Sequence, residues 1–455
     1  MWKLLCLLAL CGLLSPSEGK VPGIRSVFSN TEINKVLISV LKQNDLLGNH
    51  LKAITLSDID LGGLLSLTGK IAGLKVSSAQ ITGSAVVLLP DKINVTISVH
   101  VEITGSALLL TTSAVSISLD LSLRVIYGFE NFSDGFLDVK FYECANAYGA
   151  IDIQVLGISL PLSAITTIQN SIIADLNLQL CPILKVVFDV AKVVLLNTLN
   201  VVFPLGIYGN VKIQLASLPA LLDAYVGIDL YVDLQVAGTI ISIPSVALSI
   251  GVPLLHNYKH CQAIHPGVVN IVLSVISPKQ PVELSCTPDK YSKADELRNA
   301  ILALIPAGSS AIISANTLYL RIFLLVDPVI EFKATGAIVF AKVQVEVFVK
   351  NADGSVLSVL VVSSNLKLAA AISVVSSKLK IVLSISGNPL LLVSSGVGII
   401  DVSSLVSHFN NLLAEIFLPL INGPLASGIH LPAILGISLD SVFIQLTDGA
   451  LLLYI

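Results

Sequence analysis

Hydrophobic and polar residues alternate over long stretches of this chain. From Ile93 to Ile103 every odd position is Ile or Val, and the even positions are Asn, Thr, Ser, His and Glu. The same alternation runs from Val115 to Val125 and from Val226 to Val236. A period of two predicts β-strands with one apolar and one polar face, here about twice the usual strand length. Such strands predict large antiparallel sheets that enclose an apolar interior.

Apolar residues at helical spacing separate these strand-rich regions. A first helix is expected from about Thr31, because Ser29 and Glu32 have the spacing of a capping box. A long helix is expected after Pro161, and Pro182 should break or kink it. A last long helix is expected from about Asp401. The apolar stripes that predict these three helices are Ile33, Val36, Leu37, Val40 and Leu41; Ile165, Ile168, Ile172 and Leu176; and Leu405, Phe409, Leu412, Leu413, Ile416 and Phe417.

The two halves of the chain show a similar order of elements, and 455 residues exceed one ordinary domain. The segment 244–266 is rich in Pro, Gly and His, which is typical of a connection. We therefore predict an N-terminal domain at 20–243, a linker at 244–266 and a C-terminal domain at 267–455. Further predicted elements are strands at 51–156, 211–243, 317–385 and 442–453, and shorter helices from Val268 and over 289–305.

The first 19 residues have the pattern of a secretory signal peptide. Lys3 provides the positive end, the segment from Leu4 to Leu14 is apolar, and small residues stand at Ser17 and Gly19. The mature protein is therefore expected to be secreted and extracellular. Elsewhere the uncharged stretches are interrupted by Pro, Asn, Gly or Ser, so we expect no transmembrane segment.

Charge and composition narrow the class of partner. The chain has 26 basic and 30 acidic residues, which gives a net charge of −4. It therefore lacks the excess of positive charge that attracts nucleic acid. It is 54% hydrophobic but only 5% aromatic. Small and branched side chains give an adaptable apolar wall, and burying an acyl chain gains about 0.8 kcal/mol per methylene. This composition favours an interior that holds a lipid.

Four cysteines remain after the leader, Cys144, Cys181, Cys261 and Cys286, and they allow three pairings. We favour the sequential pairing, with all three open at this point. Asn94 and Asn131 stand in glycosylation sequons, the second in a segment typical of a turn.

The His-rich segment is the one candidate metal site. His256, His260, Cys261 and His265 have ligand-like spacing. A cysteine in a secreted chain is usually oxidised, so we favour a solvated linker whose Cys261 pairs with Cys286, and no metal.

No catalytic fingerprint stands in the sequence. There is no Gly-x-Ser-x-Gly, no His-Glu-x-x-His and no Walker loop. We therefore predict no enzyme, no catalytic residues and no cofactor, with a secreted hydrolase as the enzymatic alternative.

Three segments resemble the BPI/LBP/PLUNC superfamily of bactericidal/permeability-increasing-like lipid-binding proteins, in particular its long PLUNC branch (BPI fold-containing family B). Cys144 and Cys181 flank the passage from strand to long helix, and Cys181-Pro182 is similar to the family's Cys-Pro. The segment 211–219 resembles the strand before the family's central linker. The run from Asn411 to Leu453, with Gly428-Ile429-His430-Leu431-Pro432, resembles its last helix, turn and closing strand.

The resemblance implies an α+β boomerang of two antiparallel β-barrels, each wrapped on a long amphipathic helix and joined by a central β-sheet. It implies a conserved Cys144–Cys181 disulfide and an apolar pocket for phospholipid or other acyl chains in each barrel. The expected pocket residues are those of the helical stripes: Ile33, Val36, Leu37, Val40, Leu41, Ile165, Ile168, Ile172, Leu405, Phe409 and Leu412.

The family also suggests a role in innate mucosal defence, including antimicrobial activity, through bacterial lipids. The basic residues between Lys20 and Glu102 form no cluster, however, so we do not expect tight binding of lipopolysaccharide. The alternatives are a carrier of small hydrophobic signals and an interaction protein without a ligand.

Overall fold

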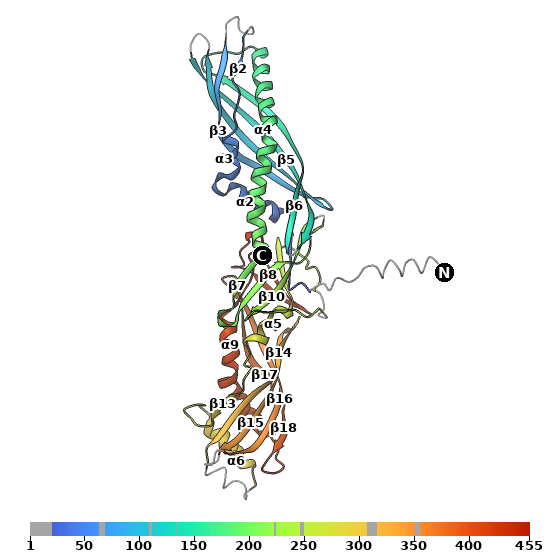
Figure 1. Ribbon diagram of the computed structural model, residues 1–455, viewed down its shortest axis with the longest axis vertical. Coiled ribbons are helices and arrows are strands. Elements are labelled where there is room, and N and C mark those ends of the chain that lie inside the picture. The colour runs from blue at the N-terminus through green and yellow to red at the C-terminus, as the bar shows by residue number, and fades with distance from the viewer. Residues whose placement is uncertain are drawn as a thin grey trace, which may run out of the picture.

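A computed structural model of the chain describes residues 21–62, 69–108, 112–133, 135–222, 224–245, 250–306, 316–350 and 355–455. The molecule is elongated, with an N-terminal lobe at one end, a C-terminal lobe at the other and a sheet between them (Figure 1). This confirms the predicted two-domain α+β architecture. The predicted signal peptide lies outside the described residues.

A sheet of long antiparallel strands forms the N-terminal lobe, in the order β2-β3-β4-β5-β6. The alternation seen in the sequence matches the burial pattern, because Val99 and its ladder partner Leu121 face the interior while Ser98 and Ser122 face outward. The strands are β2 (Ile59–Asp60), β3 (Lys70–Leu88), β4 (Lys92–Leu108), β5 (Thr112–Ser133) and β6 (Phe136–Val155).

Helices α2 (Asn30–Lys42), α3 (Leu46–Lys52) and α4 (Leu162–Leu196) pack on this sheet (Figure 1). Ser29 caps α2 as predicted, since its Oγ accepts a hydrogen bond from the Glu32 N–H at 3.2 Å. Pro182 lies inside α4 and does not end it, so of the expected break or kink the break is wrong. The missing backbone hydrogen bond is offset by a buried stripe that continues on both sides of the proline, from Ile168 to Ala191.

Both halves of the chain contribute to the central sheet, which has the order β20-β21-β12-β1-β10-β8-β7, with β9 and β11 also on β10. Strand β12 lies inside the predicted linker 244–266, and it pairs with β1 on one side and β21 on the other. The prediction of a solvated linker is therefore wrong for this part. The strands are β1 (Ile24–Ser29), β7 (Asn200–Pro204), β8 (Asn210–Leu215), β9 (Ala220–Leu222), β10 (Tyr225–Val236), β11 (Thr239–Ser242), β12 (His260–Ile264), β20 (Phe443–Thr447) and β21 (Ala450–Tyr454).

The single strand expected at 442–453 is a hairpin of β20 and β21. Its turn contains Gly449, whose φ of 86° lies in the left-handed region that glycine adopts without strain. The alternation hid this turn because apolar residues stand on both sides of Asp448 and Gly449.

A second sheet, in the order β13-β14-β15-β16-β17-β19 with β18 on β16, forms the C-terminal lobe with its helices. Its strands are β13 (Val282–Ser285), β14 (Leu318–Lys333), β15 (Gly336–Lys350), β16 (Val356–Val375), β17 (Lys378–Gly387), β18 (Leu390–Ser395) and β19 (Ile429–His430). Its helices are α5 (Pro266–Ile276), α6 (Ala294–Leu304), α8 (Val406–Leu412) and α9 (Leu418–Ser427).

The last predicted helix is divided in the structure, because a π-helical segment at Leu413–Phe417 joins α8 to α9. By length and composition the described helix Ser403–Ser427 could cross a membrane. Its Phe409, Leu412 and Phe417 are fully buried in the C-terminal lobe, so packing in the core accounts for part of this apolar composition.

Candidate functional site

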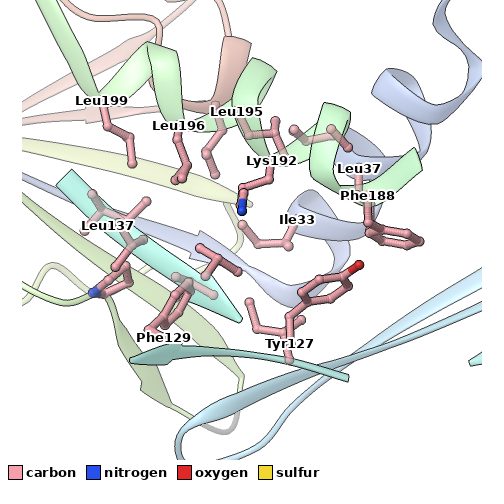
Figure 2. Close-up of a pocket in the computed structure, with 18 of the residues that line it drawn as sticks. Ile33, Leu37, Tyr127, Phe129, Leu137, Phe188, Lys192, Leu195, Leu196 and Leu199 are labelled. Carbon is pink, nitrogen blue, oxygen red and sulfur yellow. The ribbon is translucent and has the colours of Figure 1, made fainter. Parts of the chain in front are cut away.

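An apolar cavity of about 150 Å³ lies where the N-terminal lobe meets the central sheet (Figure 2). Helices α2 and α4 form one side, strands β4, β5 and β6 another, and β10 closes it from the central sheet. The residues that line it are Ile33, Val36, Leu37, Ile93, Val95, Tyr127, Phe129, Leu137, Val139, Phe188, Ala191, Lys192, Leu195, Leu196, Leu199, Pro219, Val226, Ile228 and Leu435.

Local periodicity places these side chains. Ile33 and Leu37 are one turn apart on α2 and point the same way. Val226 and Ile228 are two residues apart on β10 and share its inner face, as Leu137 and Val139 do on β6. Leu435 reaches the cavity from the C-terminal half of the chain, so the cavity needs both halves to be in place.

The predicted pocket residues divide into three groups. Ile33, Val36 and Leu37 line the cavity. Val40 and Leu41, also on α2, and Ile168 and Ile172, near the start of α4, pack elsewhere in the N-terminal lobe, and Ile165 is half-buried on α4 outside the cavity lining. Leu405, Phe409 and Leu412 are fully buried in the C-terminal lobe.

Sequence reasoning missed the C-terminal part of α4, which lines the cavity through Phe188, Ala191 and Leu195. It also did not assign Val95 or Ile228 to a pocket, although both stand at apolar positions of predicted strands. Periodicity marks such residues as inward-facing and gives no sign of which ones leave a space between them.

Two polar groups reach the cavity wall. Tyr127 is 8% exposed, and its buried hydroxyl has no hydrogen-bond partner. Burial, and secondly the negative charge of Asp189, raises the pKa of Tyr127 above its usual value, so the hydroxyl stays protonated. Lys192 lies one turn after Asp189 on α4, with its Nζ 3.5 Å from the carboxylate.

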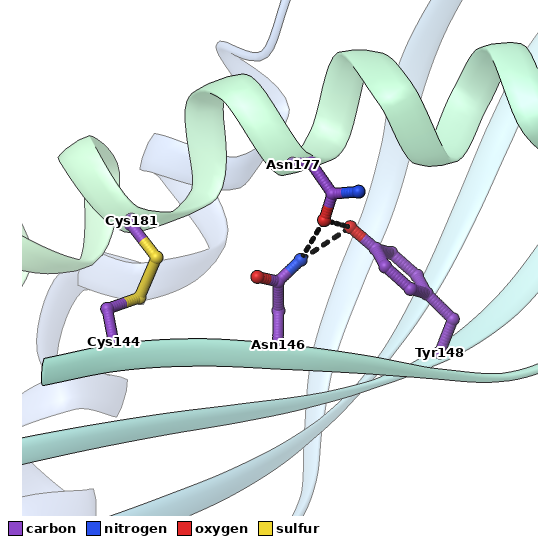
Figure 3. Close-up of a disulfide and its surroundings, with 5 residues drawn as sticks. All are labelled: Cys144, Asn146, Tyr148, Asn177 and Cys181. Atoms are coloured by element: carbon purple, nitrogen blue, oxygen red, sulfur yellow. Dashed lines mark hydrogen bonds between the residues drawn. A yellow bond between two sulfur atoms is a disulfide. The ribbon is translucent and has the colours of Figure 1, made fainter.

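A disulfide and a hydrogen-bonded cluster fasten α4 to β6 (Figure 3). The Cys144–Cys181 bond confirms the expected pairing. Beside it, Asn146 Nδ2 and Tyr148 Oη both donate to Asn177 Oδ1, at 2.6 and 2.8 Å. These contacts hold α4 in register with the sheet before it reaches the cavity.

The predicted second disulfide is wrong, because Cys261 and Cys286 are both free and buried. Cys261 lies in β12 of the central sheet, whereas Cys286 follows β13 in the C-terminal lobe. Burial raises the pKa of Cys286 to about 11 and that of Cys261 to about 12. Both thiols therefore stay protonated, which makes them poor nucleophiles and poor metal ligands.

The histidines of the same segment have separate structural roles. His260 is buried in the central sheet, and His265 caps α5 by accepting the Gly267 N–H at 2.8 Å on Nδ1. Among the residues that the structure describes, no three His, Cys, Asp or Glu side chains come together as a metal site.

The two sequons lie on strands. Asn94 is half-buried on β4, where its Oδ1 accepts a hydrogen bond from Arg124 Nε at 3.2 Å. Asn131 is exposed near the end of β5, within the strand and not in the expected turn. Glycosylation at both positions stays a prediction.

Comparison with known proteins gives matches over most of the chain. The model of the LBP / BPI / CETP family N-terminal domain matches residues 33–199, and that of its C-terminal domain matches residues 266–454. The mouse protein BPI fold-containing family B member 3 is 23% identical over 468 residues, which cover 98% of each chain. The human BPI fold-containing family B member 4 is 25% identical, covering 86% of this chain and 65% of that protein.

Among solved structures, the crystal structure of lipopolysaccharide binding protein superposes with a TM-score of 0.65. The superposition covers 95% of this chain and 98% of that one, at 17% sequence identity. This likeness concerns the fold.

Proposed function

The chain belongs to the LBP/BPI/CETP family, and we propose that it is a secreted protein that binds amphipathic lipids through the cavity beneath α4. In this proposal an acyl chain enters between α2, α4 and the strands of the N-terminal lobe. The protein sequesters or presents the lipid and has no catalytic role.

The apolar wall of the cavity is the observation that carries this proposal. Nearly all of the side chains that line it are hydrocarbon, and they come from segments far apart in the sequence. An apolar cavity of about 150 Å³ is a site that small apolar molecules enter, and each buried methylene contributes about 0.8 kcal/mol. Ligand sites for drug-sized molecules start at roughly 300 Å³, so a whole phospholipid would require the lobe to open.

Of the two lobes, the N-terminal lobe is the better candidate for the lipid site. In the C-terminal lobe the large side chains Phe332, Phe409 and Phe417 are all almost fully buried. Aromatic rings of this size fill the centre of a domain, so we assign the lipid site to the N-terminal cavity and not to the stripe around Leu405.

Secretion and a role in mucosal defence form part of the proposal. The signal-like leader and the Cys144–Cys181 disulfide support an oxidising compartment. Several basic side chains of the N-terminal lobe are paired with carboxylates, among them Lys35 with Glu32, Lys52 with Asp45 and Lys70 with Asp58. Paired lysines provide little attraction for lipid A phosphates, so the cargo in this proposal is a simpler lipid.

A carrier of small hydrophobic signals is the second candidate, and the size of the cavity favours it. An interaction protein without a ligand and a secreted hydrolase are the remaining alternatives.

Native mass spectrometry of the full-length protein secreted from cultured cells tests the proposal. We expect an added mass that organic extraction removes and identifies as a fatty acid or phospholipid. A volatile hydrophobic compound in the extract would favour the carrier. Protein that carries nothing and takes up neither oleate nor phosphatidylcholine from vesicles would contradict lipid binding.

A further inference from the structure

Two side chains interrupt an otherwise apolar cavity. Among the described residues that line it, only Tyr127 and Lys192 carry a polar side-chain group. In Figure 2 the Lys192 amine points into the cavity between Leu195 and Ile33, and the Tyr127 hydroxyl lies on the side of Phe188. A polar group in a hydrocarbon wall costs free energy unless it has a hydrogen-bond or charge partner. These two side chains therefore indicate which polar groups a ligand of this cavity would carry.

Tyr127 offers a fixed hydrogen-bond donor. Its ring packs against Phe141 and Phe188, with ring centroids 5.5 and 5.2 Å away, so the direction of the hydroxyl is set by its neighbours. The hydroxyl oxygen is buried and has no partner in the protein. Its raised pKa keeps it in the O–H form, which donates to an oxygen acceptor.

Lys192 offers a positive charge with which an anionic ligand can pair. Its side chain is 29% exposed, and its stem passes along the apolar wall with the amine pointing into the cavity (Figure 2). The pair that it forms with Asp189 is separated by 3.5 Å and partly exposed, and a pair of this kind contributes little to stability. A ligand anion can therefore replace Asp189 at small cost.

The same carboxylate connects the two groups. Asp189 pairs with Lys192, and its charge also acts on the Tyr127 hydroxyl. Lys192 and Tyr127 both line the cavity where α4 covers it, Lys192 from α4 itself and Tyr127 from β5, where its ring packs on Phe188 of α4. The rest of the cavity wall is hydrocarbon. The cavity volume of about 150 Å³ suits part of one acyl chain and not two acyl chains side by side.

We propose that Lys192 and Tyr127 form the polar end of the cavity and select single-chain amphiphiles whose head group is an anion, either a carboxylate or a phosphate. This inference rests on the proposed lipid-binding function. Lys192 pairs with the negative charge, and Tyr127 donates a hydrogen bond to a head-group oxygen. Charge-assisted hydrogen bonds of this type are about twice as strong as neutral ones.

Ligands with one tail and different heads test this inference on the full-length protein. Dodecanoate, dodecyl phosphate and dodecanol, each below its critical micelle concentration, compete with the uncharged fluorescent probe N-phenyl-1-naphthylamine. The variants are Lys192→Met, which keeps the stem without the charge, and Tyr127→Phe, which removes only the hydroxyl. Lys185→Met is the matched control, because Lys185 is an exposed lysine of α4 that does not line the cavity.

We expect the unmodified protein to bind both anions about tenfold or more tightly than dodecanol. Lys192→Met should abolish this preference, and Tyr127→Phe should weaken the binding of all three ligands by a few fold. Lys185→Met should behave like the unmodified protein. A preference for only one anion would identify the head group as carboxylate or phosphate.

Three results would overturn the inference. Equal affinity for dodecanol and the anions, with the probe bound normally, would reject the selective polar end and leave lipid binding intact. The same would follow if Lys185→Met lost the preference as fully as Lys192→Met. No binding of the probe or of any ligand would reject both this inference and the proposed function.

Discussion

The imidazole of His260 stacks on the ring of Phe28, with centroids 4.1 Å apart and planes within 9° of each other. His260 is in β12 and Phe28 in β1, so this contact joins the two halves of the chain inside the central sheet. Both imidazole nitrogens are buried without a hydrogen-bond partner. A histidine in this position is held neutral, and it is costly to protonate.

His260 should make the protein acid-sensitive. Burial lowers its pKa to about 3, from 6.5 in the unfolded chain. The unfolded state therefore binds a proton that the folded state does not, and the stability present above pH 6.5 is lost as the pH falls from there toward 3. At about pH 4.5 the loss should be roughly 2–3 kcal/mol.

Urea unfolding of the unmodified protein and of His260→Phe at about pH 7.5 and about pH 4.5 measures this loss. The phenylalanine keeps the stack on Phe28 and removes the titration, so the variant should lose less stability in acid. His50→Gln, a half-buried histidine of α3, is the control and should follow the unmodified protein. Identical acid losses in all three proteins would contradict the assignment to His260.

Removing the Cys144–Cys181 disulfide should destabilise the N-terminal lobe. The bond closes a loop with a sequence separation of 37 residues, for which the chain-entropy model gives about 4 kcal/mol. The double substitution Cys144→Ala/Cys181→Ala should lower the free energy of unfolding by about 4 kcal/mol. A reducing agent should destabilise the unmodified protein and leave the double variant unchanged; equal sensitivity of the two would show that the effect lies elsewhere.

Filling the cavity should weaken ligand binding without unfolding the protein. Val36 lines the cavity, and Val40, one turn later on α2, does not. Val36→Trp should weaken N-phenyl-1-naphthylamine binding by about tenfold or more, because the indole occupies the ligand space, at a stability cost of about 1–3 kcal/mol. Val40→Trp carries the same added bulk and should keep the binding. Equal binding by the two variants would place the probe outside the cavity.

Asn422 should be important for the C-terminal lobe. Its amide on α9 donates to the Leu383 carbonyl at 2.9 Å and accepts the Leu383 N–H at 2.8 Å, which ties the helix to β17. Asn422→Ala leaves two backbone groups unpaired and should cost about 1–3 kcal/mol in urea unfolding. Ser427→Ala, at an exposed position of the same helix, should cost much less. If the two substitutions had the same effect, the paired hydrogen bonds would not be the cause.

Alternation made the strands of this protein predictable, and the helix starting at Asn30 was predictable from its cap and stripe. The strand β12 was not, since Cys261, Gln262 and Ala263 give no alternation when both faces are buried. The assignment of the β12 part of 244–266 to a solvated linker failed for this reason, and with it failed the pairing of Cys261 with Cys286. Pro182 does not break its helix because the burial of a whole stripe outweighs one missing hydrogen bond.

The sequence by itself determined which side chains face inward, because the period of a strand or helix fixes the direction of each residue. The tertiary structure decided where the inward-facing side chains leave a cavity between them. The cavity lies between α2, the last turns of α4, β10 and Leu435, and these segments meet only when the lobe docks on the central sheet. A cavity depends on how segments distant in the sequence pack against one another. For this reason the sequence alone does not show that Tyr127 and Lys192 line the same cavity.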